Sequence, residues 1–319
     1  MFKVRTKTTS MSLFKSVIKK VFNLAGYKIV RNNRISNFSQ KNPDIVTCAY
    51  KATDDFLIRV PLEKFRWGLL GFPYTRESMH PFVQTLVDYE SGFCKTYRNS
   101  VMEDYYNSFQ PASVADALGL TNLGPEVSKL EDIPIIACPG PWIAKDINYF
   151  IDNTKRKIEK ENSIHGARIS YHHGGGGFGP VSEQKGTLEF TRLIKVYRSI
   201  KAKGFKRNDA SDGDIGGIIL KNNSTYKIFV NSGHHRISAL AALNFDYAPV
   251  RINIGVGMVG IVNREDVSSW PLVSSGLFRK SEALALFDRI FDGSPPEAAR
   301  IWADKQLNRV FSGYSTKNG

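Results

Sequence analysis

The sequence is poor in cysteine and contains no long apolar run. Its 319 residues include three cysteines, Cys48, Cys94 and Cys138, which lie far apart and form no CxxC pair. This spacing excludes a disulfide scaffold and a zinc knuckle, and it fits a reducing compartment. No stretch approaches the ~20 apolar residues that a membrane-spanning helix needs. Hydrophobic residues nevertheless make up 42% of the chain, enough to exclude wholesale disorder and a fibrous repeat.

Acidic residues are absent from the beginning of the chain, and this absence explains most of the net charge of +14. Residues 1–43 contain ten Lys or Arg and no Asp or Glu, which leaves a balance of only +4 for the rest. A DNA-binding body would carry its basic charge on a folded face. DNA is therefore not an expected partner of the body.

A short amphipathic helix is predicted within this basic arm, residues 1–45. Ser12 can cap the helix and Gly26 can end it, with apolar residues at helical spacing between them. A cationic helix of this kind can lie in the headgroup layer of an anionic membrane, or it can pack on the protein's own core. Lysines interrupt every possible apolar core of a signal peptide. We expect a cytoplasmic chain whose residues 12–34 can contact an anionic membrane surface.

Residues 46–170 are predicted to form a mainly helical domain. Apolar spacing indicates helices over 80–89, 102–109 and 114–118, and a charged helix or linker over 153–161. Clustered aromatic residues can line a groove, although aromatics at this spacing more often form a core; they are Tyr97, Tyr105, Tyr106 and Phe109. No catalytic chemistry is expected here.

A run of four glycines, Gly174 to Gly177, follows His172 and His173. Glycine loses too much backbone freedom for such a run to be helix or central strand. It is a hinge, a lid, a flexible linker or a backbone cradle for an anion. The run lacks the Gly-Lys-Ser/Thr ending of a P-loop. A metal site is not expected, because adjacent histidines point apart and no Cys or Asp completes a set.

The next region alternates strand and helix patterns. A helix is predicted to end at Gly204, followed by strands over 215–220 and 226–230, a helix over 237–243 and a strand over 249–254. The strand–helix–strand run predicts a compact, right-handed βαβ unit. Helices are also expected over 281–291 and 296–307.

The turn before the 237–243 helix carries the residues best suited to hold phosphate. A helix start directs unpaired N–H groups and a partial positive charge outward, and Gly233 allows a tight turn. Arg236 adds a forked cation, while His234 and His235 titrate near neutrality. Together with Ser232 these residues predict a nucleotide-phosphate or phosphoryl-transfer site.

The segment from about Glu183 to Ile254 resembles a ParB/sulfiredoxin-fold (ParB-like nuclease) domain. The resemblance rests on the helix end 198–204, the strand 227–230, the Gly-x-His-Arg-x-x-Ala pattern from Gly233 to Ala239 and the strand 248–252. It covers about a quarter of the chain. The resemblance implies a nucleotide-binding signature loop, as in CTP-hydrolysing partition proteins, ATP-using sulfiredoxins and a free-serine kinase.

Departures from these patterns favour the kinase-like members. Sulfiredoxin carries its catalytic cysteine directly before the His-Arg pair, where this chain has His234. Partition proteins continue with a helix-turn-helix module, which the segment 292–296 fits poorly. The free-serine kinase uses a glutamate before or at the first helix as its base, which makes Glu189 and Glu183 candidates. Arg192 at i+3 can orient Glu189 for such a role. The alternative interpretation, equally well supported, is that Glu189 is a surface carboxylate favoured by the helix dipole.

The expected architecture is α/β (α+β), with a ParB/sulfiredoxin-like module over 171–258 and a C-terminal helical extension over 259–319. The expected activity is transfer of phosphate from ATP or another nucleoside triphosphate, with Mg²⁺, to a hydroxyl-bearing small molecule or glycan. Arg236 would clamp phosphate, His235 would position it, and Glu189 or Glu183 would be the base.

Two further expectations concern the arm and the alternative function. The arm resembles the leader of enzymes encoded in bacterial surface-polysaccharide clusters, which implies a peripheral location on the cytoplasmic face of the inner membrane. The alternative function is that of a non-enzymatic, ParB-like nucleotide-binding or DNA-binding regulatory protein.

Overall fold

The structure is a computed structural model that describes residues 36–38, 55–121, 128–143, 146–207, 214–252 and 260–315, with side chains as far as residue 307. Residues 36–319 belong to one compact unit, without a boundary near residue 170. The helix predicted after Ser12 lies outside the described residues, and so does Cys48. Among the described helices, none has the length and apolar character needed to cross a membrane.

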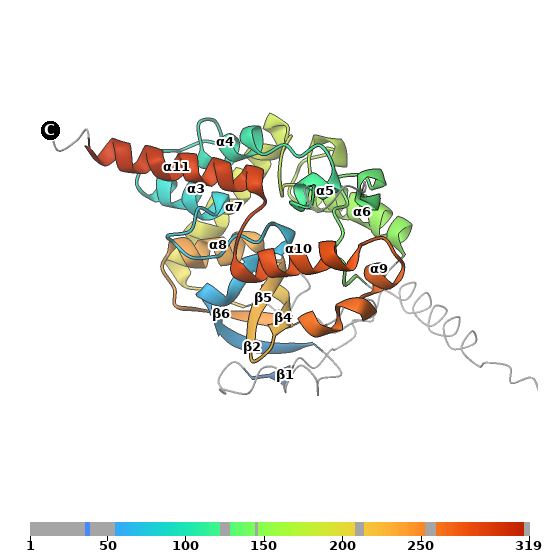
Figure 1. Cartoon of the computed structure of the whole chain (residues 1–319). Helices are drawn as coiled ribbons and strands as arrows, with labels where there is room; N and C mark the ends of the chain where they lie inside the picture. The colour runs from blue at the N-terminus through green and yellow to red at the C-terminus, as the bar shows by residue number, and fades with distance from the viewer. Residues whose placement is uncertain are drawn as a thin grey trace, which may run out of the picture. The chain divides into compact units, whose positions relative to one another are not determined.

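A mixed sheet of seven strands runs through the described part of the chain (Figure 1). The strand order is β1-β2-β6-β4-β5-β3, and β7 lies beside β4. The strands are β1 (Ser36–Asn37), β2 (Phe56–Pro61), β3 (Phe65–Trp67), β4 (Gly216–Asn222), β5 (Thr225–Ser232), β6 (Tyr247–Ile252) and β7 (Ile261–Asn263). The fold is therefore mixed α/β, as predicted.

Two of these strands lie within residues 46–170, the region predicted to be mainly helical, and neither of them was predicted. β2 pairs with β6 along its whole length, and β3 pairs with β5. The strand pattern of β2 was hidden in the sequence because its first three residues, Phe56, Leu57 and Ile58, are all buried. A strand buried on both faces shows no apolar–polar alternation.

The predicted right-handed βαβ unit is wrong. β4 is antiparallel to β5 and parallel to β6, so β5 and β6 run in opposite directions with β4 between them. A right-handed crossover joins two parallel strands of one sheet, and this connection does not. The sequence pattern identified the strands and the helix, but it could not show that β4 inserts between them.

The helices follow the predicted spacing closely. They are α3 (Pro81–Glu90), α4 (Val101–Ser108), α5 (Val114–Ala117), α6 (Ile147–Ile164), α7 (Glu183–Lys203), α8 (His234–Ala242), α9 (Pro271–Ser274), α10 (Lys280–Asp292) and α11 (Glu297–Ser315). α7 starts at Glu183 because the Ser182 side chain accepts a hydrogen bond from the Lys185 amide and caps the helix.

One core cluster lies between the sheet and the bundle of α3, α7 and α8, which pack on one another (Figure 1). A second cluster packs α10 against β4. The aromatic residues predicted to be core are buried, which confirms that interpretation over a groove lining; they are Tyr97, Tyr105, Tyr106 and Phe109. This packing holds the first turn of α8 against the middle of α7.

Candidate functional site

The turn from β5 into α8 has the tight geometry that the sequence predicted. Gly233 adopts a left-handed conformation with φ of 79°, and α8 begins at the next residue. A Cβ atom on Gly233 would lie 2.9 Å from the carbonyl oxygen of Asp214, so any other residue would clash. No side chain caps this helix start. The first-turn amides therefore keep the polarity that favours an anion.

His234 turns toward the aromatic core beside the turn. Its Nδ1 lies 2.9 Å from the Tyr74 hydroxyl. Burial, together with the smaller effect of the neighbouring His235, lowers the pKa of His234 to about 4. His234 is therefore neutral at physiological pH and acts as a buried hydrogen-bonding group.

His235 points in a different direction, as expected for adjacent helical residues. Its ring stacks on Phe82 with 5.5 Å between centroids and an interplanar angle of 4°. Its Nε2 lies 3.0 Å from Glu189 Oε2, although the ring N–H is not well aligned with that oxygen. Two residues that the sequence singled out separately, Glu189 and His235, are thus brought together.

Glu189 lies at the centre of a buried charged network on α7. Its Oε1 accepts hydrogen bonds from Lys185 Nζ at 2.6 Å and from Arg192 Nη1 at 2.9 Å. Burial alone would raise the pKa of Glu189, but His235, Arg192 and Lys185 outweigh it and hold the pKa well below its usual range. The predicted orientation by Arg192 is confirmed, and the surface interpretation of Glu189 is wrong because its side chain is only 7% exposed.

Two members of this network, Lys185 and Asn162, were not predicted from the sequence. Lys185 is buried on the same helix and also donates to Asn162 Oδ1 at 2.7 Å. Its position four residues before Glu189 was a readable signal, because such pairs share a helix face. Asn162 gave no signal, since it comes from α6 and reaches the network only through tertiary packing.

The glycine run packs against this network. The Tyr106 hydroxyl donates to Gly176 O at 2.8 Å, and the Tyr105 hydroxyl donates to Gly177 O at 3.0 Å. A Cβ atom on Gly176 would lie 3.9 Å from the Glu189 carboxyl carbon. The run is therefore an anchored cover over Glu189, which is not the geometry of a free linker.

His173, the second histidine before the run, has a structural partner. His173 Nδ1 lies 2.9 Å from Ser182 Oγ, the residue that caps α7. Among the described residues no group of three His, Cys, Asp or Glu side chains is placed to hold a metal ion.

Glu183, the other candidate base, lies apart from this network. It is the first residue of α7, and its carboxylate makes two hydrogen bonds with Arg98, at 2.8 and 3.0 Å. The pair is largely exposed to solvent. The geometry thus unites His235 with Glu189 and leaves Glu183 at the surface.

A second charged cluster borders Gly233 on the sheet side, and the sequence analysis missed it as well. The buried carboxylate of Asp214 lies 2.9 Å from Arg207 Nε and 3.6 Å from Arg251 Nη1. Arg251 pairs across the sheet with Gly216, which in turn pairs with Ser232. Arg207 and Arg251 thus place two guanidinium groups on the carboxylate beside the turn.

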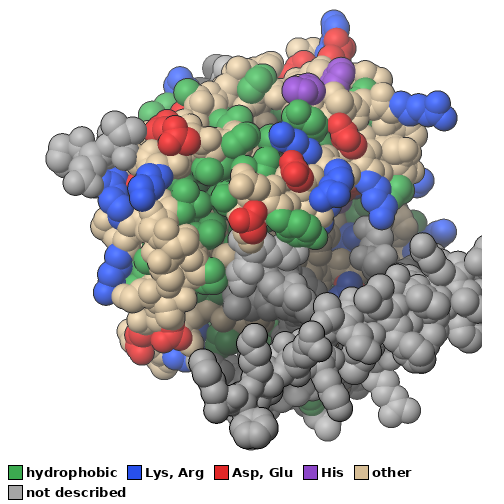
Figure 2. Space-filling model, turned by 90° about the vertical axis from the view of Figure 1, so that its right-hand side faces the viewer, with side chains coloured by type: hydrophobic (Ala, Val, Ile, Leu, Met, Phe, Trp, Pro, Cys, Tyr) green, Lys and Arg blue, Asp and Glu red, His purple; other side chains and the backbone are tan. Residues whose placement is uncertain are grey.

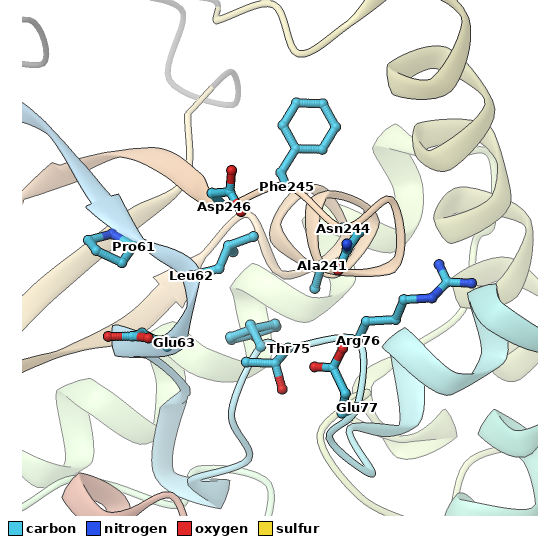
Figure 3. Close-up of a pocket in the computed structure, with 11 residues that line it drawn as sticks. Pro61, Leu62, Glu63, Thr75, Arg76, Glu77, Ala241, Asn244, Phe245 and Asp246 are labelled. Carbon is cyan, nitrogen blue, oxygen red and sulfur yellow. The ribbon is translucent and has the colours of Figure 1, made fainter.

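Two hollows are described on the molecule, and Ser232 to Arg236 line neither of them. One, of about 170 Å³, lies beyond the C-terminal end of α8, where Asn244, Phe245 and Asp246 border it (Figure 3). The other, of about 340 Å³, lies between α3 and α7. A phosphate at the turn would therefore bind outside both of these hollows.

The chain was compared with protein families, curated proteins and solved structures. No family model, no curated protein and no solved structure matches this chain.

Proposed function

We propose that the chain is a nucleotide-dependent phosphotransferase of the kinase type, built on a ParB/sulfiredoxin-like module. The observation that carries the proposal is the 3.0 Å contact between His235 Nε2 and Glu189 Oε2 at the start of α8. It pairs a titratable ring with an ionised carboxylate beside a helix start suited to phosphate. This is the arrangement that proton transfer next to a phosphoryl group requires.

The charge of Glu189 determines which of the two residues, Glu189 or His235, serves as the base. A carboxylate whose pKa is held so low takes up a proton only in strong acid, so it is a weak base at neutral pH. Glu189 is better suited to orient His235 through Nε2. Among the described residues none hydrogen-bonds to the other ring nitrogen, Nδ1, which is then the proton acceptor.

In the proposed step, His235 Nδ1 takes the proton of the acceptor hydroxyl while the hydroxyl oxygen attacks the terminal phosphorus. The bond from that phosphorus to the bridging oxygen of the nucleoside triphosphate breaks, which releases a nucleoside diphosphate. The amides of the Gly233 turn and the guanidinium of Arg236 stabilise the phosphate charge. The acceptor we propose is a small hydroxyl compound or a glycan intermediate at the cytoplasmic face of a membrane.

Magnesium normally accompanies a nucleoside triphosphate, but the described carboxylates near the turn are not available to bind it. Glu189 is paired with Lys185 and Arg192, and Asp214 is paired with Arg207 and Arg251. A carboxylate shared by two cations is a poor ligand for a further cation. We therefore assign no step to the metal.

The first test compares nucleotide binding and turnover in the wild type, Arg236→Ala and His235→Asn. Loss of a charge-assisted phosphate contact weakens ATP affinity about 10-fold or more in Arg236→Ala. His235→Asn keeps the affinity and lowers turnover about 100-fold or more, because only the proton acceptor is lost. Calorimetry and a phosphate-release assay measure the two effects.

A matched control is Arg264→Ala, which removes an arginine paired with Asp288 at 2.6 Å in a different part of the chain. We expect it to bind and turn over nucleotide like the wild type. Equal ATP affinity in the wild type and Arg236→Ala would remove the phosphate site. Undiminished turnover in His235→Asn would remove the proposed base.

One observation favours a second candidate, a nucleotide-binding regulatory protein without turnover. Both oxygens of Glu189 are already bonded, to Lys185, Arg192 and His235, as in a network that only supports structure. This candidate predicts ATP affinity that depends on Arg236 but no hydrolysis or transfer. A DNA-binding version gains little support from Figure 2, where basic and acidic side chains are interspersed over the face shown.

A further inference from the structure

A hollow between α3 and α7 lies outside the proposed phosphate site. We call it the α3–α7 groove and define it by Tyr89, Lys95, Phe190, Ile194, Lys195 and Arg198. Its volume of about 340 Å³ reaches the range of ligand-binding sites, whereas the hollow at the end of α8, about 170 Å³, does not. The groove is therefore the better candidate for a second binding surface.

Every charged side chain that lines the groove is basic. Lys95 and Lys195 have no carboxylate partner among the described residues. On the bordering helices, Glu90 pairs with Arg76 and Lys201, Glu183 with Arg98, and Glu189 with Lys185 and Arg192. The partly buried Asp88 of α3 is not among the residues that line the groove. The groove thus presents positive charge that the described part of the chain leaves unneutralised.

The third cation of the groove is held in place. Arg198 Nε donates to the Tyr89 hydroxyl at 2.7 Å, and the guanidinium lies 5.3 Å from the centroid of the same ring. A guanidinium fixed in this way loses little side-chain freedom when it binds a carboxylate. Phe190 and Ile194, both mostly buried, form the apolar floor between the cations.

We propose that the α3–α7 groove binds an acidic peptide segment of a partner protein, with carboxylates on either side of one apolar side chain. The carboxylates would meet Lys95 on one wall and Lys195 and Arg198 on α7, while the apolar side chain rests on Phe190 and Ile194. The basic arm of this chain is excluded as the occupant by its like charge.

The aromatic residues of the groove argue against single-stranded nucleic acid. Binding of that kind relies on exposed aromatic faces on which bases stack. The Tyr89 ring is occupied by Arg198, and the Phe190 side chain is buried in the core. Charge without a stacking surface fits carboxylates better than nucleobases.

The test uses the full chain and a fluorescent peptide of sequence Glu-Glu-Leu-Glu-Glu, with binding followed by anisotropy. Lys195→Glu lowers the affinity about 10-fold or more, because a like charge replaces an attractive one in the groove. Lys203→Glu, a charge reversal on the exposed last turn of α7 outside the groove, is the matched control and leaves the affinity within twofold. Binding to the basic arm is the same in both variants, so their difference reports the groove.

A second experiment reverses the charge of both the groove and the peptide. The double variant Lys95→Glu/Lys195→Glu gains affinity for Lys-Lys-Leu-Lys-Lys at least 10-fold over the wild type. Equal affinity of Lys195→Glu and Lys203→Glu for the acidic peptide overturns the proposal. The proposal also fails if the wild type binds the uncharged peptide Gln-Gln-Leu-Gln-Gln as tightly as the acidic peptide. Tighter binding of oligo-dT that is lost in Lys195→Glu would overturn the peptide assignment in favour of nucleic acid.

Discussion

Glu189 is the residue on which the candidate site depends. Lys185, Arg192 and His235 surround its buried carboxylate, and Lys185 is the buried cation that would lose its only acidic partner among the described residues if the charge were removed. Removal of one member of a buried ion pair typically costs about 3–5 kcal/mol, because the remaining charges stay buried. The network therefore contributes to the packing of α7 on α8 as well as to the proposed chemistry.

We predict that Glu189→Gln lowers the free energy of unfolding by about 2–4 kcal/mol at pH 7. The low pKa of Glu189 in the folded state means that its stabilisation is present above the unfolded value near 4.5 and is lost as the pH falls below it. The difference between the wild type and Glu189→Gln should therefore shrink below about pH 4.5. Urea unfolding at a series of pH values measures both effects.

Glu183→Gln is the control for this prediction, since it changes the same chemical group on the same helix at the solvent-exposed pair with Arg98. Exposed pairs contribute little to stability, so its unfolding curve should overlay that of the wild type. If Glu183→Gln were as destabilising as Glu189→Gln, the buried network would not explain the effect.

At the scale of elements, α7 is the helix that joins the candidate site to the groove. Glu189 and Arg192 face the site, while Lys195 and Arg198 line the groove. The position of α7 is fixed by a close approach at Gly186, where a Cβ atom would lie 2.1 Å from the Tyr97 ring. This contact brings α7 against the region of α4 and sets the direction of its charged faces.

We expect Gly186→Ala to destabilise the fold by about 2–3 kcal/mol, because the added methyl group overlaps the buried Tyr97 ring. The better helix propensity of alanine, about 1 kcal/mol, offsets only part of this strain. The measurement is the unfolding temperature relative to the wild type, for Gly186→Ala, Thr187→Ala and Gly186→Ala/Tyr97→Leu. The exposed neighbour Thr187 tolerates alanine, and the double variant recovers part of the loss; a neutral Gly186→Ala would contradict the close approach.

The elements also show how far the sequence could predict the structure. α7 and α8 were predictable because their apolar residues recur at helical spacing, and the Gly233 turn was predictable from its residue types. The strand β2 was missed because Phe56, Leu57 and Ile58 form an unbroken buried run, which removes the apolar–polar alternation from its first half. The insertion of β4 between β5 and β6 depends on pairing between distant segments, which no local pattern encodes.

The candidate site was predictable in part for the same reason. His235 and the glycine run were chosen from local features and Glu189 from the family resemblance, and the structure brings all three together. Lys185 could have been found from its i, i+4 relation to Glu189. Asn162 and Asp214 could not, because each reaches its charged partners only through tertiary contacts.

At the scale of the whole molecule, charge and fold occupy different parts of the chain. Residues 36–319 form one compact unit, and nine of the ten basic residues of the arm precede residue 36. The stability of the unit and any attraction to an anionic surface should therefore be separable.

We predict that deletion of residues 1–35 leaves the unfolding temperature within about 2 °C of the wild type, because the deleted segment lies outside the compact unit. The same deletion should abolish flotation with liposomes that contain anionic lipid, since each basic residue near such a surface contributes about 1 kcal/mol. Replacement of Lys15, Lys19 and Lys20 by glutamine in the full chain should weaken flotation without changing the unfolding temperature. Flotation that survives the deletion would assign membrane attraction to the folded unit, and a lowered unfolding temperature would show that the arm packs on the core.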